Sequence, residues 1–120
     1  LYGAQVVYYT VDDRRPIDVD ALEQFLLENE GFQLATLVHC ETPSGITNPV
    51  GKLCPLLNKH GIITVVDSVS AIAGEELNVD EYKIDIVLGG SQKCLSAPPG
   101  LTFMSISSKA WNKMANRQVP

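Results

Sequence analysis

Short apolar runs alternate along this chain with stretches in which apolar residues recur at helical spacing. The strongest run, Ile62–Val66, is wholly apolar, as expected of a central parallel strand that is covered on both faces. Helical spacing is clearest over Val19–Glu30, where Asp18 is expected to cap the first turn and Gly31 to end the helix. The pattern predicts further strands at Ala4–Thr10, Leu34–His39, Ile84–Leu88 and Leu101–Ile106, and further helices at Val50–His60 and Lys109–Arg117, the last capped by Ser107 or Ser108.

Strands that alternate with helices and are joined by short polar loops predict an α/β fold, with a mostly parallel sheet and helices on both faces. Pro55 is expected to kink the helix over Val50–His60 or to shift its start. In parallel sheets the ligand crevice lies beyond the carboxyl ends of the strands. This rule selects three loops, those that follow His39, Val66 and Leu88.

Composition excludes several classes of function. The 120 residues are 45% hydrophobic and 19% charged, which is typical of a folded globular domain. A net charge of −5 makes nucleic acid and anionic membranes poor partners, and no apolar run is long enough to span a bilayer. The cysteines and histidines share no ligand spacing, so we expect no metal site, and an odd number of cysteines fits a reducing cytosol.

Asp67 is the first candidate for chemistry. A carboxylate directly after five apolar strand residues is costly unless a cation or several hydrogen-bond donors accompany it. It either caps a helix over Ser68–Ala73 or accepts a hydrogen bond from a protonated nitrogen of a ligand.

Lys93 is the second candidate, since it follows a Gly-Gly-Ser-Gln turn at a predicted strand end. Most lysines are solvated surface residues. The small and apolar flanks here predict a partly desolvated amine, which would be a better nucleophile. The neighbouring Cys94 is expected to be a small buried packing residue, and His39 is either a core histidine or a residue that stacks on or donates to a ligand.

Two motifs resemble those of a known family. One is the apolar strand that ends in Asp67-Ser68-Val69 and is followed by Gly74. The other is Gly-Ser-Gln-Lys-Cys-Leu with Ala-Pro-Pro-Gly after it, and the two key residues are 26 positions apart (67 to 93). With the softer match HCETPSGITNP (His39–Pro49), the chain resembles the class V, fold-type I aminotransferases that depend on pyridoxal 5′-phosphate (PLP), in the alanine–glyoxylate, serine–glyoxylate and serine–pyruvate branch.

The resemblance implies a role for each matching residue. Lys93 would carry PLP as a Schiff base and act as catalytic acid and base, and Asp67 would pair with the pyridine nitrogen. Val69 would pack on the ring, Thr42 would lie near its polar substituents, and Gln92 would lie near the phosphate. The reaction implied is transamination between a small amino acid, alanine or serine, and a 2-oxo acid such as glyoxylate or pyruvate.

The resemblance also implies that residues 1–120 are a fragment of the PLP-binding large domain, without the N-terminal segment and the C-terminal small domain. Such a fragment is expected to be inactive alone, and the full-length protein to be a homodimer in the cytoplasm, with peroxisome or mitochondrion left open. Other class V reactions remain as alternatives, among them those of a ureidoglycine–glyoxylate aminotransferase or a lyase, and so does a module without catalytic activity.

Overall fold

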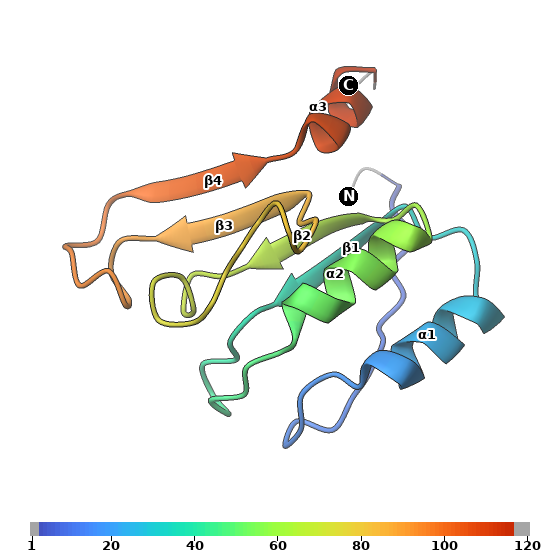
Figure 1. Ribbon diagram of the computed structural model, residues 1–120, viewed down its shortest axis with the longest axis horizontal. Coiled ribbons are helices and arrows are strands. Elements are labelled where there is room, and N and C mark those ends of the chain that lie inside the picture. The colour runs from blue at the N-terminus through green and yellow to red at the C-terminus, as the bar shows by residue number, and fades with distance from the viewer. Residues whose placement is uncertain (1–2, 117–120) are drawn as a thin grey trace.

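In the computed structural model, which describes residues 3–116, the chain folds around one four-stranded sheet (Figure 1). Its strand order is β1-β2-β3-β4. The first three strands are parallel and β4 is antiparallel to β3. This confirms the predicted mostly parallel sheet. The strands are β1 (Leu34–Val38), β2 (Ile63–Asp67), β3 (Ile86–Gly90) and β4 (Thr102–Ile106).

The helices form at the predicted places, and their caps explain their bounds. They are α1 (Val19–Glu28), α2 (Val50–Lys59) and α3 (Ser108–Ala115). Asp18 and Ser107 cap α1 and α3, since the side-chain oxygen of each accepts a hydrogen bond from the backbone N–H three residues later. Helix α1 ends before the predicted Glu30 because Asn29 adopts an extended conformation. Pro55 lies inside α2, but the helix still begins at Val50, so its start is not shifted. The predicted end of α3 at Arg117 lies outside the described residues.

The strand predicted at Ala4–Thr10 is wrong. This segment pairs with no strand among residues 3–116, and Val6, Val7 and Tyr8 are exposed. Strand propensity describes a side chain that fits a pleated, half-buried surface, and it cannot supply the paired neighbour on which a strand depends.

Two strands start and end later than predicted, which changes the position of the polar residues. Asp67 is the last residue of β2 rather than the first residue of the loop, and Gly89 and Gly90 belong to β3 rather than to a turn. The β3 shift arises because the backbone N–H of Ile84 donates to Val79 in a turn, while the Asp85 side chain turns toward β2.

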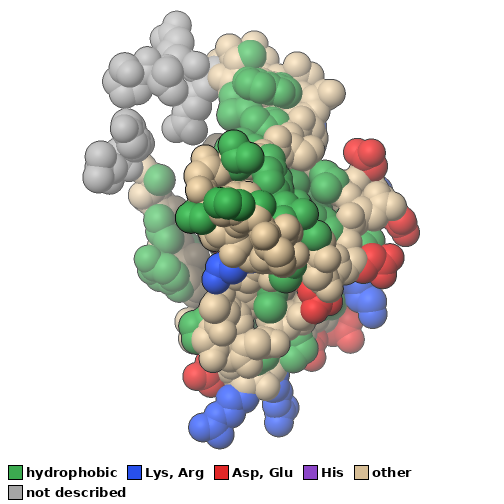
Figure 2. Space-filling model, turned by 90° about the vertical axis from the view of Figure 1, so that its left-hand side faces the viewer, with side chains coloured by type: hydrophobic (Ala, Val, Ile, Leu, Met, Phe, Trp, Pro, Cys, Tyr) green, Lys and Arg blue, Asp and Glu red, His purple; other side chains and the backbone are tan. Residues whose placement is uncertain are grey.

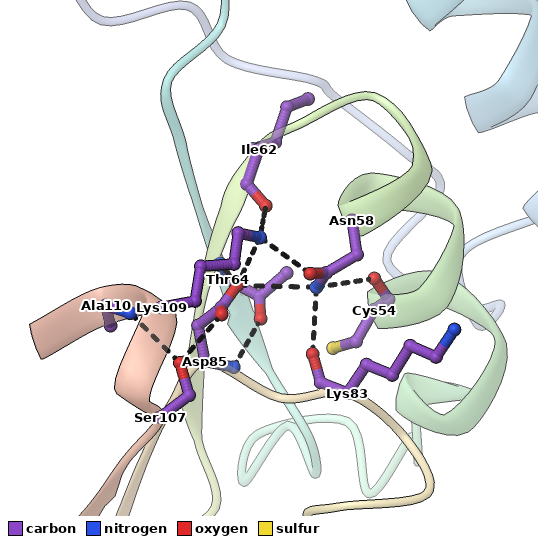
Figure 3. A network of polar contacts seen from close by, with 9 residues as sticks. All are labelled: Cys54, Asn58, Ile62, Thr64, Lys83, Asp85, Ser107, Lys109 and Ala110. Carbon is purple, nitrogen blue, oxygen red and sulfur yellow. Dashed lines mark hydrogen bonds and ion pairs between the residues drawn. The ribbon is translucent and has the colours of Figure 1, made fainter. Parts of the chain in front are cut away.

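Asp85 is the centre of a buried polar network at the amino ends of β2 and β3 (Figure 3). Its carboxylate accepts hydrogen bonds from Thr64 N (3.1 Å) and Ser107 Oγ (2.9 Å), and it forms an ion pair with Lys109 (3.1 Å). The Asp85 N–H in turn donates to Thr64 Oγ1 (2.9 Å). The network therefore joins β2, the start of β3 and the start of α3.

The hydrophobic core lies between the sheet and the two helices α1 and α2, which both cover the same face (Figure 1). Paired strand residues point to one face, and the face under α2 contains the buried residues Thr64, Val66 and Val87. On the other face Leu34 and Met104 are 53% and 55% exposed. Residues 3–116 thus supply the expected helices for one face of the sheet. Within the run Ile62–Val66, the side chains that point to this face, Thr64 and Val66, are fully buried.

Candidate functional site

The carboxyl ends of the three parallel strands meet at one edge of the sheet, where their arrowheads point the same way (Figure 1). Every residue singled out from the sequence lies at this edge. Thr42 follows β1, Asp67 ends β2 with Val69 two residues later, and Gln92 and Lys93 follow β3. Figure 2 views the molecule from this side, and hydrophobic side chains (green), with backbone and other uncharged side chains (tan), make up most of its centre.

Ser70 joins the three loops to one another. Its hydroxyl forms a hydrogen bond with Thr42 Oγ1 (2.9 Å), and its carbonyl accepts one from Cys94 Sγ (3.5 Å). The loop that carries Thr42 and the loop that carries Lys93 therefore both contact the turn that follows Asp67. Ser70 was not singled out from the sequence, because a serine among other small residues gives no distinctive signal.

The Asp67 carboxylate is exposed and only partly engaged. Its Oδ1 accepts a hydrogen bond from Val69 N (2.9 Å), which closes a turn rather than the helix that was one of the two expectations. None of the hydrogen bonds or ion pairs within residues 3–116 involves Oδ2. One oxygen thus shapes the local backbone while the other can accept a hydrogen bond from a ligand.

Lys93 is exposed, and the partial desolvation expected from its flanks is wrong for this chain. The whole segment from residue 92 to residue 100 is exposed, because it extends beyond the ends of β3 and β4. In the described part of the chain, no hydrogen bond or ion pair holds its amine. Its carbonyl accepts a hydrogen bond from Ser96 N (2.8 Å), and Ser96 has a φ of 54°, so the backbone turns tightly here.

Ser91 fixes the base of the Lys93 loop. It is buried, its hydroxyl donates to Pro98 O (2.7 Å), and its carbonyl accepts from Ala97 N (3.0 Å). Gln92 folds back over Gly90, where a Cβ atom would lie only 2.7 Å from its Oε1. The end of the Gln92 side chain therefore lies against Gly90, the last residue of β3.

Cys94 packs against Gly74, the glycine of the first motif. A Cβ atom on Gly74 would lie 2.6 Å from Cys94 Sγ. The prediction that Cys94 is a packing residue is confirmed by this contact, but the prediction that it is buried is wrong, since the side chain lies on the exposed loop. Because position 74 carries no side chain, the turn after β2 and the loop after β3 can approach closely here.

His39 is a core histidine, which was one of the two expectations. It is 3% exposed, and its Nδ1 forms a hydrogen bond with Ser68 Oγ (3.0 Å). Burial lowers the pKa of the imidazole, and the charge of Glu75 opposes this effect more weakly. The ring is therefore part of the support beneath the site.

The sequence profile of the family described as aminotransferase class-V matches residues 1–119. The chain belongs to this family. The resemblance that the motifs indicated is thereby confirmed, and so is the fold. Among the relatives is the pyridoxamine–pyruvate transaminase of Mesorhizobium japonicum, which is 36% identical over 120 residues, 99% of this chain and 30% of the relative.

Solved aminotransferases have the same fold. The ureidoglycine–glyoxylate aminotransferase of Bacillus subtilis superposes with a TM-score of 0.84 at 28% identity, over 92% of this chain and 28% of that protein. The alanine–glyoxylate aminotransferase of a Nostoc species gives 0.81 at 26% identity, over 88% of this chain and 28% of that protein. The chain spans less than a third of the length of the curated relatives it matches. None of the described helices is long and apolar enough to cross a membrane.

Proposed function

We propose that the loops after β1, β2 and β3 form part of a PLP site, and that the full-length protein is an aminotransferase acting between a small amino acid and a 2-oxo acid such as pyruvate or glyoxylate. In this proposal residues 1–120 are the central part of the large domain of a homodimeric cytoplasmic enzyme. The observation that carries it is the convergence of the Asp67 turn and the Lys93 loop on Ser70, within a chain of the class V family.

The residues present suit this cofactor. A protonated pyridine nitrogen requires an acceptor, and Asp67 Oδ2 is an exposed carboxylate oxygen that no described residue engages. An aldehyde requires an amine, and the Lys93 amine is exposed without an ion pair among residues 3–116. Thr42 and Ser70 supply two neutral hydroxyls, which are hydrogen-bonded to each other, on the loops after β1 and β2.

When bound, PLP supplies an aldehyde carbon that bonds to amines and a ring that withdraws electrons from the substrate α-carbon. Lys93 would hold the cofactor through its amine and would later take the proton from the substrate α-carbon. Asp67 would keep the pyridine nitrogen protonated and Val69 would pack on the ring. Thr42 and Gln92 would orient its polar groups and its phosphate.

The substrate class rests on what the relatives act on. Pyruvate is the partner in the names of the pyridoxamine and 2-aminoethylphosphonate transaminases, and glyoxylate is the partner in two of the solved structures. A ureidoglycine donor is the second candidate, favoured by the high structural similarity to the Bacillus subtilis enzyme. Transamination rates with alanine, serine and ureidoglycine, each paired with pyruvate and glyoxylate, would separate the two.

A lysine substitution tests the proposal directly. The full-length protein with PLP should gain a visible absorbance band, and borohydride should fix the cofactor on the peptide that contains Lys93. Lys93→Ala should lose both signals and lower the transamination rate on the order of 10³-fold, because covalent attachment and proton transfer are lost together. Lys52→Ala removes an exposed lysine of α2 and should behave as the unaltered protein. Cofactor fixed on another lysine, or full turnover by Lys93→Ala, would overturn the proposal.

A further inference from the structure

His39 occupies a position between the two loops that carry Thr42 and Asp67. It directly follows β1, and its N–H donates to Asp67 O (2.8 Å), which extends the pairing of β1 and β2 by one bond. Its carbonyl accepts a hydrogen bond from Asn48 N (2.7 Å), which closes the loop that contains Thr42. Its backbone thus ties both loops to the same point of the sheet.

The imidazole adds a third tie, directed at the residue after Asp67. Its Nδ1 lies 3.0 Å from Ser68 Oγ, and the two side chains are 3% and 0% exposed. Ser68 uses its other polar groups elsewhere, because its N–H donates to Leu88 O and its carbonyl accepts from Ala71 N and Ile72 N. The imidazole is therefore the partner that satisfies the buried hydroxyl.

The direction of the Asp67 side chain depends on the turn that Ser68 begins. Asp67 Oδ1 is held by Val69 N, so the carboxylate and the turn move together. Ser68 is fixed to β3 through its N–H and to the end of β1 through its hydroxyl. Removal of the imidazole would leave that hydroxyl buried without a partner and release one of the two fixed points.

We propose that His39 is a positioning residue of the cofactor site, whose imidazole acts through Ser68 to fix the turn that aims the Asp67 carboxylate. This inference rests on the proposed PLP function. The lowered pKa of the imidazole agrees with it, since a neutral ring keeps one hydrogen-bonding arrangement with the hydroxyl.

Two substitutions at position 39 separate positioning from simple packing. In the full-length protein, His39→Leu fills the space without a hydrogen bond, whereas in His39→Asn an amide takes the place of Nδ1. We expect His39→Leu to weaken the binding of PLP to the apoprotein and to lower kcat, each about tenfold or more, with KM little changed. His39→Leu should also shift the midpoint of the pH titration of the visible absorbance. His39→Asn should restore the PLP affinity and kcat to within about threefold of the unaltered protein, and should return the titration midpoint to that of the unaltered protein.

Ser68→Ala tests the same contact from the other side and keeps the inference testable if His39→Leu does not fold. It should weaken PLP binding as His39→Leu does, and the double variant should be no worse than either single one. His60→Leu removes the other imidazole of the chain, at the C-terminal end of α2, and is expected to leave PLP binding unchanged.

The outcomes distinguish this inference from the function on which it rests. If the unaltered protein binds no PLP, the proposed function fails. If the unaltered protein binds PLP and Ser68→Ala or a folded His39→Leu binds it equally well with an unshifted titration, the positioning role of His39 is overturned while the proposed function stands.

Discussion

At the scale of single residues, burial separates three cysteines that look equivalent in the sequence. Cys54 is fully buried under the sheet, whereas Cys94 is exposed on the Lys93 loop and Cys40 is intermediate. Burial raises the pKa of Cys54 to about 12; a hydrogen bond with Thr64 offsets part of this rise, and the charge of Asp85 adds to it. Since the thiolate is the reactive form, Cys54 is expected to be inert at neutral pH.

Labelling with a thiol reagent checks this expectation. When the native protein is treated with iodoacetamide at pH 7.5 and digested for mass spectrometry, Cys54 should stay unmodified until denaturant is added. Cys94→Ser should leave the protection of Cys54 unchanged, because the two side chains belong to separate parts of the fold. Native modification of Cys54 at the rate of an unfolded control peptide would show that the sheet does not cover this face of α2 as described.

At the scale of elements, the Asp85 network decides where β3 begins and how it is held beside β2 and α3 (Figure 3). Burial alone would raise the pKa of the carboxyl group. The hydrogen bonds from Thr64, Ser107 and Lys109 and the charge of Lys109 outweigh this effect and lower the pKa below its ordinary value. A carboxyl group whose pKa is lower in the folded protein than in the unfolded chain stabilises the fold at pH values above its unfolded pKa, which is near 4 for aspartate. This stabilisation is lost as the pH falls through the folded-state pKa.

Asp85→Asn should therefore destabilise the protein at neutral pH and make it less sensitive to acid. We expect a loss of about 1–3 kcal/mol in the free energy of unfolding at pH 7, because Thr64 N or Ser107 Oγ loses its acceptor. The difference from the unaltered protein should shrink toward pH 3. Urea unfolding at both pH values measures it, with Asp80→Asn as an exposed control. A difference that does not depend on pH would contradict the assignment of the lowered pKa.

The contact between Gly74 and Cys94 couples the turn after β2 to the loop after β3. In Gly74→Ala the new methyl group would collide with Cys94 Sγ, and Cys94 is joined directly to Lys93. Because Cys94 is exposed and can move, we expect a cost of no more than about 1 kcal/mol in the free energy of unfolding, below the range for a packed core, together with weaker PLP binding by the full-length protein. Cys94→Ala in the same protein should recover most of both, since it removes the sulfur. Equal losses in the single and double variants would show that the two loops are not coupled here.

At the scale of the whole molecule, local chemistry predicted the elements well and their pairing less well. The caps Asp18 and Ser107, the helix starts and the parallel sheet follow from residues near in sequence. The segment Ala4–Thr10 has no paired strand among residues 3–116, and the late start of β3 involves the contact of Asp85 with Thr64, 21 positions away; propensity contains neither kind of information. In the same way, Asp67 and Lys93 were recognisable from their motifs, whereas Ser70 became visible only through contacts with residues that are 28 and 24 positions away.

The isolated 120-residue chain should show no transaminase turnover, although it contains both Lys93 and Asp67. Its relatives are more than three times longer, the Lys93 loop is exposed throughout, and Leu34 and Met104 lie uncovered on the second face of the sheet. A site whose loops lack their remaining contacts cannot hold the cofactor and substrate in a fixed orientation, which is the source of a large part of the rate enhancement. The isolated chain should therefore bind PLP at least tenfold more weakly than the full-length protein, and sedimentation should show self-association through the exposed apolar face. Turnover by the isolated chain at a rate comparable to that of the full-length protein would mean that residues 1–120 hold a complete site.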